Sequence, residues 1–531
     1  PSTKPSGRKG ASVADRRESC RAVLLNPPTA APSSVILLNL AYLSSALKEA
    51  GHEVLVLDAT APHRRLSEAQ VEREVRAFAP HFIGVTLTIT WIPATYAYLE
   101  RLARLGIPIV AGGPHANCLP EEILAHGPRI VAIGEGEETI VELADHFLGR
   151  RPLESIAGLC FRRDDGSVHA TPRRPLIEDL DRIPLPDYAS FPIAHYTGSP
   201  DPHSNPIFWS VFSSRGCPYN CIFCSSHNVF GRTYRARSPR NVYDEIEHVA
   251  ATYGARVFAF QDDEAFINKR RIIEFCDLVR EGRFPLKFSA RLRIDSLDGD
   301  MLAAMKAAGF RRLSFGVESF NDETLSKINK KYTVATVAES FRLLEKADFP
   351  AVSFNNIIGF PWETPEHLRR NLDEIARIPP GLVYFSFTAT PIPYPGTELY
   401  ERYHAEYRFT DWWLDPARNS VPTSPPAAGA FFMLFLLVHG PLYAEDGFWR
   451  HSPRMKRAIE AFCWELSKMH LKRCLRPREF AFVYGLSRAS HWLWRRSPRL
   501  ERALFGPLVR FARRWGLDRK TKFTYRGLDD A

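Results

Sequence analysis

Short apolar runs alternate with helix-like segments along most of this 531-residue chain, and this rhythm constrains the fold more than any other feature. In the first part of the chain we expect five strands, at 21–28, 52–59, 81–88, 106–113 and 128–138. Gly51 is a suitable C-cap for the first helical segment between them, and Ser67 is a suitable N-cap for the next. Strands and helices that alternate in this way predict an α/β fold, here a doubly wound parallel sheet.

Glycine and polar residues follow these strands, at the edge of the sheet where such folds bind ligands. The turns are Asn26-Pro27-Pro28, Asp58, Thr86-Leu87-Thr88, Gly112-Gly113-Pro114-His115 and Gly134-Glu135-Gly136-Glu137. Glycine lets a ligand approach the backbone closely, although any one of these turns is also explained by local geometry. The five turns together favour a ligand-binding edge.

The same rhythm resumes after a stretch rich in proline and aspartate. We expect six further strands, at 207–214, 257–263, 286–295, 311–319, 351–360 and 382–392. Six βα units predict a partial (β/α)6 barrel of the TIM type, with its chemistry at the carboxyl ends of the strands. The predicted organisation is a disordered leader (1–20), the doubly wound domain (21–150), a linker (151–205), the barrel (206–400) and a basic, mostly helical C-terminal region (401–531).

Three cysteines, Cys217, Cys221 and Cys224, lie within eight residues, directly after the first expected barrel strand. Three thiolates in one loop can ligate three irons of a [4Fe–4S] cluster, which leaves the fourth iron open to another ligand. The alternatives are a structural zinc site, for which His227 lies close enough to be the fourth ligand, and buried thiols without a metal.

The spacing Cys217-x3-Cys221-x2-Cys224, with Phe223 as the aromatic residue before the last cysteine, resembles the signature of the radical SAM superfamily. The resemblance implies that the cysteines hold a [4Fe–4S] cluster whose open iron is chelated by S-adenosylmethionine (SAM). An electron from the cluster would cleave the S–C5′ bond of SAM to give a 5′-deoxyadenosyl radical. It also implies an electron donor such as flavodoxin or ferredoxin.

Residues at later strand ends are similar to this family in the same order, over about 205–400. The resemblance places Asp262 and Asp263 near the SAM amino group and Arg293 near its carboxylate, as opposite charges favour. Two further matches are Gly316-Val317-Glu318-Ser319, similar to a G-x-E-S segment near SAM, and Gly359 after the fifth strand. An ordinary polar turn is the alternative for each.

A doubly wound sheet before such a barrel resembles the cobalamin-binding subgroup of the family, and implies a Rossmann-like cobalamin domain over 21–150. The implied contacts are Thr86, Leu87, Thr88, Gly112, Gly113, Pro114, His115, Gly134, Glu135 and Glu137. Many cobalamin domains carry D-x-H-x-x-G, but no histidine lies two residues after Asp58. We assign no cobalt ligand, because His63 and His115 also suit a surface or supporting position, and a domain that has lost cobalamin is an alternative.

The formal net charge of +10 resides in the C-terminal region. From residue 451 onward 20 Lys and Arg oppose 7 Asp and Glu, which gives +13 and leaves −3 for the first 450 residues. Arginine and aromatic residues interleave at 489–516, as in a basic amphipathic helix at a membrane surface, while a helical cap on the barrel is the alternative. RNA binding is disfavoured because no nucleic-acid motif accompanies this region.

The cysteine count and the apolar runs predict a cytoplasmic protein, with contact at the inner membrane surface as an extension. Nine cysteines, an odd number, do not suit a secreted disulfide framework. The polar, basic first residues lack the apolar core of a signal peptide. The longest apolar run, the twelve residues 427–438, is too short to cross about 30 Å of hydrocarbon as a helix.

We therefore expect a cobalamin-dependent radical SAM enzyme, and specifically a C-methyltransferase. It would transfer a SAM-derived methyl group through methylcobalamin to an unactivated carbon of a small-molecule substrate, and a hydrophobic substrate suits a membrane-facing tail. One alternative is a radical SAM cyclase or rearrangement enzyme that uses cobalamin without net methylation. Another is a non-catalytic metal- or RNA-binding adaptor. We predict no catalytic acid or base and no nucleic-acid partner.

Overall fold

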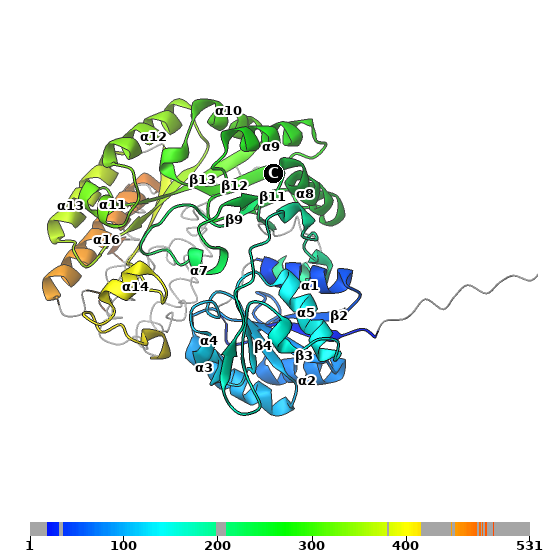
Figure 1. Cartoon of the computed structure of the whole chain (residues 1–531). Coiled ribbons are helices and arrows are strands. Elements are labelled where there is room, and N and C mark those ends of the chain that lie inside the picture. Colours follow the sequence, from blue (N-terminus) through cyan, green and yellow to red (C-terminus); the bar gives the residue numbers. More distant parts are fainter. Residues whose placement is uncertain are drawn as a thin grey trace, which may run out of the picture.

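A computed structural model of the chain shows two parallel sheets, each covered by helices (Figure 1). It describes residues 18–30, 35–197, 209–379, 382–415, 448, 452–474, 477–478, 480–481, 484–485 and 492. Three predicted features lie outside these residues: the leader up to residue 17, the apolar run at 427–438, and most of the basic segment at 489–516.

The N-terminal sheet has the strand order β2-β1-β3-β4-β5-β6-β7. Its parallel strands are β1 (Arg21–Asn26), β2 (Glu53–Asp58), β3 (Phe82–Thr86), β4 (Ile109–Gly112) and β5 (Ile130–Ala132). The order 2-1-3-4-5 is that of a doubly wound sheet, which reverses direction between β1 and β3 and places its ligand site beyond the carboxyl ends there. The predicted α/β fold is thereby confirmed for this domain.

Helices cover both faces of this sheet, as a buried parallel sheet requires. On one face lie α1 (Leu38–Glu49) and α5 (Glu137–Phe147), and on the other α2 (Glu68–Phe78), α3 (Ile92–Leu102) and α4 (Pro120–Leu124). Successive side chains of β1 point alternately to the two faces of the sheet. Ala22 and Leu24 pack in the core that α1 and α5 cover, whereas Val23 and Leu25 pack in the core under α2, α3 and α4.

The predicted linker at 151–205 is partly structured, which differs from the expectation. β6 (Leu159–Arg162) and β7 (Val168–Ala170) extend the N-terminal sheet as an antiparallel hairpin beside β5. Strands of four and three residues are too short for a visible hydrophobic period, but Asp165-Gly166 is the dipeptide that favours hairpin turns. Gly166 adopts φ +87° at this turn.

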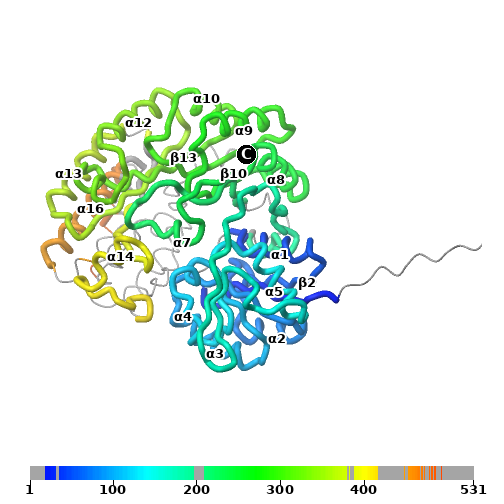
Figure 2. The backbone as a smooth tube through the Cα atoms, in the orientation of Figure 1, coloured from blue at the N-terminus to red at the C-terminus, as the bar shows by residue number. Residues whose placement is uncertain are grey.

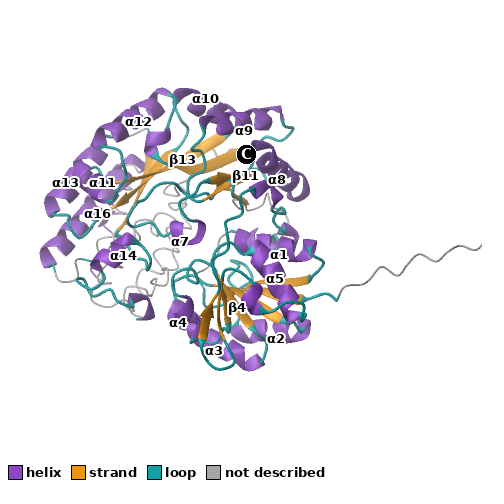
Figure 3. Ribbon diagram, viewed as in Figure 1, coloured by secondary structure: helices purple, strands orange, loops and turns teal. Residues whose placement is uncertain are grey.

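The second sheet is a partial barrel with the strand order β15-β14-β13-β12-β11-β8, all parallel, as predicted. Its strands are β8 (Trp209–Val211), β11 (Val257–Phe260), β12 (Lys287–Leu292), β13 (Phe310–Glu318), β14 (Val352–Ile357) and β15 (Val383–Ala389). The outer helices are α8 (Pro239–Tyr253), α9 (Lys269–Glu281), α10 (Gly299–Ala307), α11 (Asp322–Lys327), α12 (Val334–Lys346) and α13 (Pro365–Arg377). Figure 3 shows these helices around the outside of the strands, which leaves the inner face of the sheet free of them.

The described part of the C-terminal region is helical and packs on the barrel. α14 (Glu398–Tyr403) follows β15, and α16 (Pro453–Cys474) lies against α13 (Figure 2). One side of α16 buries Met455, Ile459, Phe462 and Leu466, which supports a helical cap for this segment. Among the described residues, no helix has both the length and the apolarity needed to span a membrane.

Candidate functional site

The three predicted metal-binding cysteines lie on a loop whose two ends are joined by a short ladder. β9 (Ser214–Arg215) pairs antiparallel with β10 (Arg235–Ala236), so residues 216–234 leave and return at the same place. Gly216 starts this loop at φ +78°, and a Cβ there would lie 2.3 Å from the Thr233 carbonyl oxygen, so the position requires glycine. We call residues 216–234, with α7 (His227–Phe230), the cysteine loop. Figure 1 places α7 between the two domains.

The donor set of the cysteine loop fits an iron–sulfur cluster. Cys221 is buried, while Cys217 and Cys224 are half-buried. Burial raises the pKa of Cys217 and of Cys224 to about 11, and the neighbouring thiols add to the rise, so the three side chains lie close together. Within the described residues, no three His, Cys, Asp or Glu side chains are arranged to hold one metal ion. Three soft thiol donors in one loop suit a larger iron–sulfur cluster, which would hold them as thiolates.

Asp262 and Asp263, predicted to lie near the SAM amino group, hold the segment that leads into the cysteine loop and a residue in its middle. The Oδ1 atom of buried Asp262 accepts hydrogen bonds from Ser213 N (2.9 Å), Ser213 Oγ (2.8 Å) and Ser214 Oγ (2.5 Å). Asp263 accepts one from Ser226, just after the last cysteine. Burial raises the pKa of both carboxyl groups. The Oδ2 atom of Asp262 is buried without a hydrogen bond, so contact with an ammonium group stays a prediction.

Arg293 supports the cysteine loop from the end of β12. Its guanidinium forms a bidentate pair with Asp295, with both distances 3.0 Å, and its Nη2 atom donates to the Lys330 carbonyl at 2.6 Å. It also lies 3.6 Å from the ring centroid of Tyr219, which belongs to the loop. These contacts occupy most of its donors, so the predicted contact with the SAM carboxylate would fall to Nη1.

Lys330 is a functional candidate that the sequence did not reveal. It is buried, its Nζ lies 3.1 Å from Glu318 Oε1 and donates to the Gly316 carbonyl at 3.1 Å, and it lies 5.8 Å from the ring centroid of Phe223. Burial lowers the pKa of Lys330, but the Glu318 carboxylate outweighs it and holds the ammonium charged. This ion pair brings Gly316, Glu318 and Phe223, all predicted cofactor contacts, together beside Cys221.

Glu318 has a strained backbone, with φ +66°, where β13 changes register against β14. A non-glycine residue in this region costs about 1–3 kcal/mol, and such residues concentrate at ligand sites. The next residue, Ser319, is fully buried and bonds to Asn321 and Asn371 instead. Its predicted cofactor contact therefore stays a prediction.

Gly359, at the end of β14, is held by the buried carboxylate of Glu363. Glu363 accepts hydrogen bonds from the Gly359 amide (2.6 Å), the Phe360 amide (3.1 Å) and the Thr324 hydroxyl (3.1 Å). Burial raises the pKa of Glu363 to about 7. Phe360 in turn packs against Phe223 of the cysteine loop, so this turn borders the predicted cluster site.

Three predicted cobalamin turns meet at the carboxyl edge of the N-terminal sheet. Gly113 has φ +94°, and a Cβ there would lie 2.8 Å from both Thr86 Oγ1 and the Leu87 carbonyl oxygen, so the two turns are in direct contact. The Leu87 amide donates to the Gly112 carbonyl at 2.8 Å. Thr88 and Pro114 are exposed on this edge.

Asn117, which the sequence did not single out, joins two of these turns. Its amide nitrogen donates to the Gly113 carbonyl at 3.0 Å, and its amide oxygen accepts from the Gly134 amide at 2.7 Å. The side chain is buried. The glycine turns after β4 and β5 are therefore fixed relative to each other.

His115 lies in a buried polar cluster that also holds the C-terminal region. Its Nε2 atom is 2.7 Å from Tyr96 Oη, which donates to Glu122 at 2.6 Å. The indole of Trp413 donates to both oxygens of Glu122, at 3.2 and 3.0 Å. Nδ1 of His115 is buried without a hydrogen bond, and His63 is exposed. Neither arrangement identifies a cobalt ligand.

The side chains of Glu135 and Glu137, predicted as cobalamin contacts, pair with arginines of the barrel, so their contact with cobalamin stays a prediction. Glu135 lies 2.8 Å from Arg215 Nη1 and 2.8 Å from Arg235 Nη1, and Glu137 lies 2.5 Å from Arg215 Nη2. Burial would raise the pKa of Glu135, but the bonds from Arg235 and Arg215 hold it below its usual value. Arg215 and Arg235 are the ladder residues at the base of the cysteine loop. We call these four residues the ionic clamp, because they attach that base to the cobalamin-type turn.

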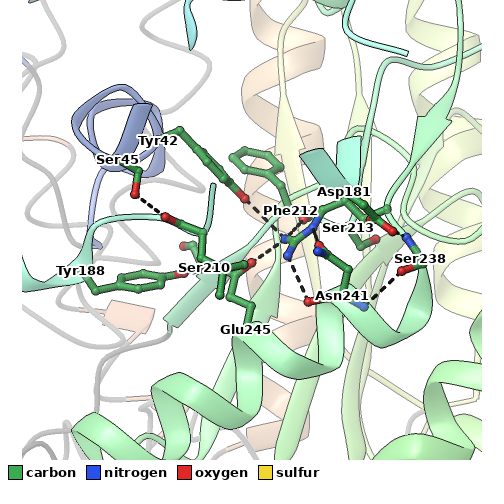
Figure 4. A network of polar contacts seen from close by, with 12 residues as sticks. Tyr42, Ser45, Asp181, Tyr188, Ser210, Phe212, Ser213, Ser238, Asn241 and Glu245 are labelled. Atoms are coloured by element: carbon green, nitrogen blue, oxygen red, sulfur yellow. Dashed lines mark hydrogen bonds and ion pairs between the residues drawn. The ribbon is translucent and has the colours of Figure 1, made fainter. Parts of the chain in front are cut away.

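A second buried network joins the domains around Arg237 (Figure 4). Arg237 donates to the Phe212 carbonyl at 2.9 Å, pairs with Glu245 of α8 and lies 3.4 Å from the hydroxyl of Tyr42 on α1. Tyr188 donates to the other oxygen of Glu245 at 2.6 Å. These side chains come from α1, the predicted linker and the barrel, so the network ties three segments together.

A cysteine loop at the open edge of a partial barrel, attached to a doubly wound sheet, defines a radical SAM enzyme with a cobalamin domain. The sequence matches the Radical SAM superfamily over residues 211–375 and the B12 binding domain over residues 30–144. The chain belongs to the cobalamin-dependent radical SAM enzymes, whose cofactors are a [4Fe–4S] cluster, SAM and cobalamin.

Two relatives carry this assignment. An uncharacterized methyltransferase, PH0819, of Pyrococcus horikoshii is 32% identical over 368 residues, which cover 68% of this chain and 77% of that protein. The anaerobic magnesium-protoporphyrin IX monomethyl ester cyclase of Cereibacter sphaeroides is 30% identical over 460 residues, 82% of this chain and 70% of the cyclase.

Solved structures share the fold. The cobalamin-dependent SAM radical enzyme OxsB, with aqua-cobalamin and SAM bound, aligns with a TM-score of 0.59 and 20% identity over 75% of this chain and 56% of that one. The methyltransferase TsrM of Kitasatospora setae, with cobalamin and a [4Fe–4S] cluster, aligns with a TM-score of 0.58 and 21% identity, over 73% of this chain and 78% of TsrM. At these identities the likeness concerns the fold alone.

Proposed function

We propose that this chain is a C-methyltransferase that transfers a SAM-derived methyl group to an unactivated carbon of a small molecule. The observation that carries the proposal is the ionic clamp, which attaches the base of the cysteine loop to the Gly134–Glu137 turn of the cobalamin domain. Methyl transfer requires the radical-forming and methyl-carrying cofactors to face one substrate. When bound, the cluster with SAM supplies radical formation and the corrin carries the methyl group.

The chain's own residues position and shield this chemistry. Lys330 and Arg293 place two buried cations beside the cysteine loop, where they can orient carboxylate groups. Asp263 and Glu318 offer carboxylates to an ammonium or to ribose hydroxyls. Burial of the Figure 4 network and of the ionic clamp excludes water from the side where the domains meet.

The test is the product balance of the anaerobically reconstituted enzyme. We expect about four irons and one corrin per chain, and release of both 5′-deoxyadenosine and S-adenosylhomocysteine when cell extract supplies substrate. Deuterium from the SAM methyl group should appear in a product. The Cys221→Ala variant should lose iron and both products, whereas Cys276→Ala, which alters a buried thiol of α9 outside the loop, should keep them.

Cyclisation is the second candidate, because the Cereibacter sphaeroides cyclase is 30% identical over 82% of this chain. A cyclase of this kind would release 5′-deoxyadenosine without S-adenosylhomocysteine and without label transfer. That outcome would replace the methyltransferase proposal while keeping the cofactors.

The proposed partners are an electron donor of the flavodoxin or ferredoxin type and a small-molecule substrate. We further propose that residues 451–531, the most basic part of the C-terminal region, contact an anionic membrane surface, as their charge of +13 favours. Co-sedimentation with phosphatidylglycerol vesicles, compared with phosphatidylcholine vesicles, tests this contact. Equal sedimentation with both would contradict it.

A further inference from the structure

The inner face of the barrel sheet carries a compact group of hydrogen-bond donors below the cofactor site. Along β12 the residues Phe288, Ala290 and Leu292 pack in the core beneath the outer helices. Side chains alternate across a strand, so Ser289 and Arg291 point to the inner face.

The neighbouring strand completes the group. Ser289 pairs with Arg312, and Arg291 pairs with Ser314 in the parallel register of β12 and β13. Paired residues lie on the same face, so the two arginines are diagonal neighbours and the two serines occupy the other corners. Strands about 4.8 Å apart with a rise of about 3.3 Å per residue put the arginine Cα atoms roughly 8 Å apart. Across that distance Arg291 can reach a bound group, and Arg312, which already has another interaction, adds positive charge beside it.

The electrostatics of this group point to an anion. Arg291 is exposed, and it has no hydrogen bond or ion pair within the part of the chain that the structure describes. Although part of its side chain is exposed, partial burial and then the positive charge of Arg312 lower the pKa of Arg291, so the site disfavours further cations. None of the four residues is a carboxylate, and planar guanidinium groups suit carboxylate or phosphate oxygens.

We infer that Arg291, with Ser289, Arg312 and Ser314, binds an anionic group of the substrate, a carboxylate or a phosphate. This inference rests on the proposed function for its substrate, because it places that substrate inside the barrel. Arg291 lies two residues before Arg293, which supports the cysteine loop at the carboxyl end of β12. The anionic group would therefore be held deeper in the barrel than this loop, and the rest of the substrate would extend toward the loop.

Anion binding is measured on the reconstituted enzyme with SAM, by calorimetric titration of inorganic phosphate and of succinate at constant chloride. The two titrations separate a phosphate preference from a carboxylate preference. We expect Arg291→Gln to raise the Kd of the preferred anion about tenfold, as loss of one charge-assisted contact implies. Arg342→Gln, at an exposed arginine of the outer helix α12, is the control and should match the unaltered enzyme. No binding, or equal Kd values in Arg291→Gln and the control, overturns the inference.

The substrate itself gives a second test. Cell extract is separated on an anion exchanger, and each fraction is incubated with the enzyme and methyl-deuterated SAM. Labelled product should arise from the retained fraction and fall about tenfold with Arg291→Gln, while SAM cleavage without substrate stays unchanged. Product from the unretained fraction alone overturns the inference. If no fraction gives labelled product, the result counts against the proposed methyl transfer. The anion titration alone then decides whether Arg291 binds an anion.

Discussion

Replacing Glu135 by glutamine should loosen the attachment between the two cofactor domains. The Glu135 side chain is 1% exposed, and its partners Arg215 and Arg235 are 10% and 7% exposed. Each carboxylate oxygen accepts from a guanidinium, and Oε2 also accepts from the Ile177 amide at 2.8 Å. A glutamine at this position has one amide nitrogen, which is a donor. Whichever way its amide is turned, that nitrogen faces an N–H donor that the carboxylate of Glu135 accepted from.

The size of the effect follows from burial. Removing one partner of a buried ion pair costs about 3–5 kcal/mol, because the remaining charge is left uncompensated. For a domain of this size that corresponds to a fall of roughly 10 °C in the unfolding midpoint. Glu138→Gln is the matched control three residues further on, in the first turn of α5, since Glu138 is 55% exposed in its pair with Arg174 and such pairs contribute about 0.2–1 kcal/mol.

Thermal unfolding as a function of pH makes the assay specific. The folded pKa of Glu135 is depressed, so its stabilisation is complete above the usual glutamate pKa and disappears as the pH falls through the lower folded value. The difference between the unaltered protein and Glu135→Gln should be constant from pH 7 to about pH 5 and shrink below about pH 4. Equal midpoints for Glu135→Gln and Glu138→Gln at pH 7 would refute this reasoning.

Three further variants probe other contacts. Gly113→Ala should lower the unfolding free energy of the N-terminal domain by about 1–3 kcal/mol, because the left-handed backbone and two 2.8 Å contacts forbid a Cβ. Gly112→Ala, which has open space for a Cβ, is the control for stability, and equal unfolding midpoints for the two variants would contradict the prediction. Trp413→Phe removes two hydrogen bonds to Glu122 and should lower the unfolding free energy by about 1–3 kcal/mol in urea titration, so an unchanged midpoint would count against the contact. Glu245→Gln leaves its partner Arg237 buried without a counter-ion and should lower the unfolding free energy by about 3 kcal/mol in the same titration. The loss should be larger than that of Trp413→Phe, and a smaller loss would contradict the prediction.

Local pattern was sufficient to predict the parallel strands of both sheets. All eleven expected strands are present, because buried parallel strands require continuous apolar runs. The hairpin of β6 and β7 was missed because its strands are too short for a period. Its Asp165-Gly166 turn was the available signal.

The partners of the site residues could not be predicted in the same way. Glu135 and Arg215 are 80 residues apart in sequence, and Lys330 reaches Gly316 only through the turn after α11. A glutamate in a glycine turn has the same local pattern whether it contacts a cofactor or an arginine of another domain. Tertiary packing decides between these roles, so the cysteines were predictable from spacing but the ionic clamp was not.

The ionic clamp also has a consequence for the order in which the enzyme is assembled. The predicted corrin site lies at the edge of the N-terminal sheet that the clamp attaches to the barrel, and separating the two would expose four largely buried charged groups at once. A newly made chain meets no such obstacle before its halves associate. We therefore expect corrin to load more slowly into a chain whose ionic clamp has already formed than into one whose two halves are still apart.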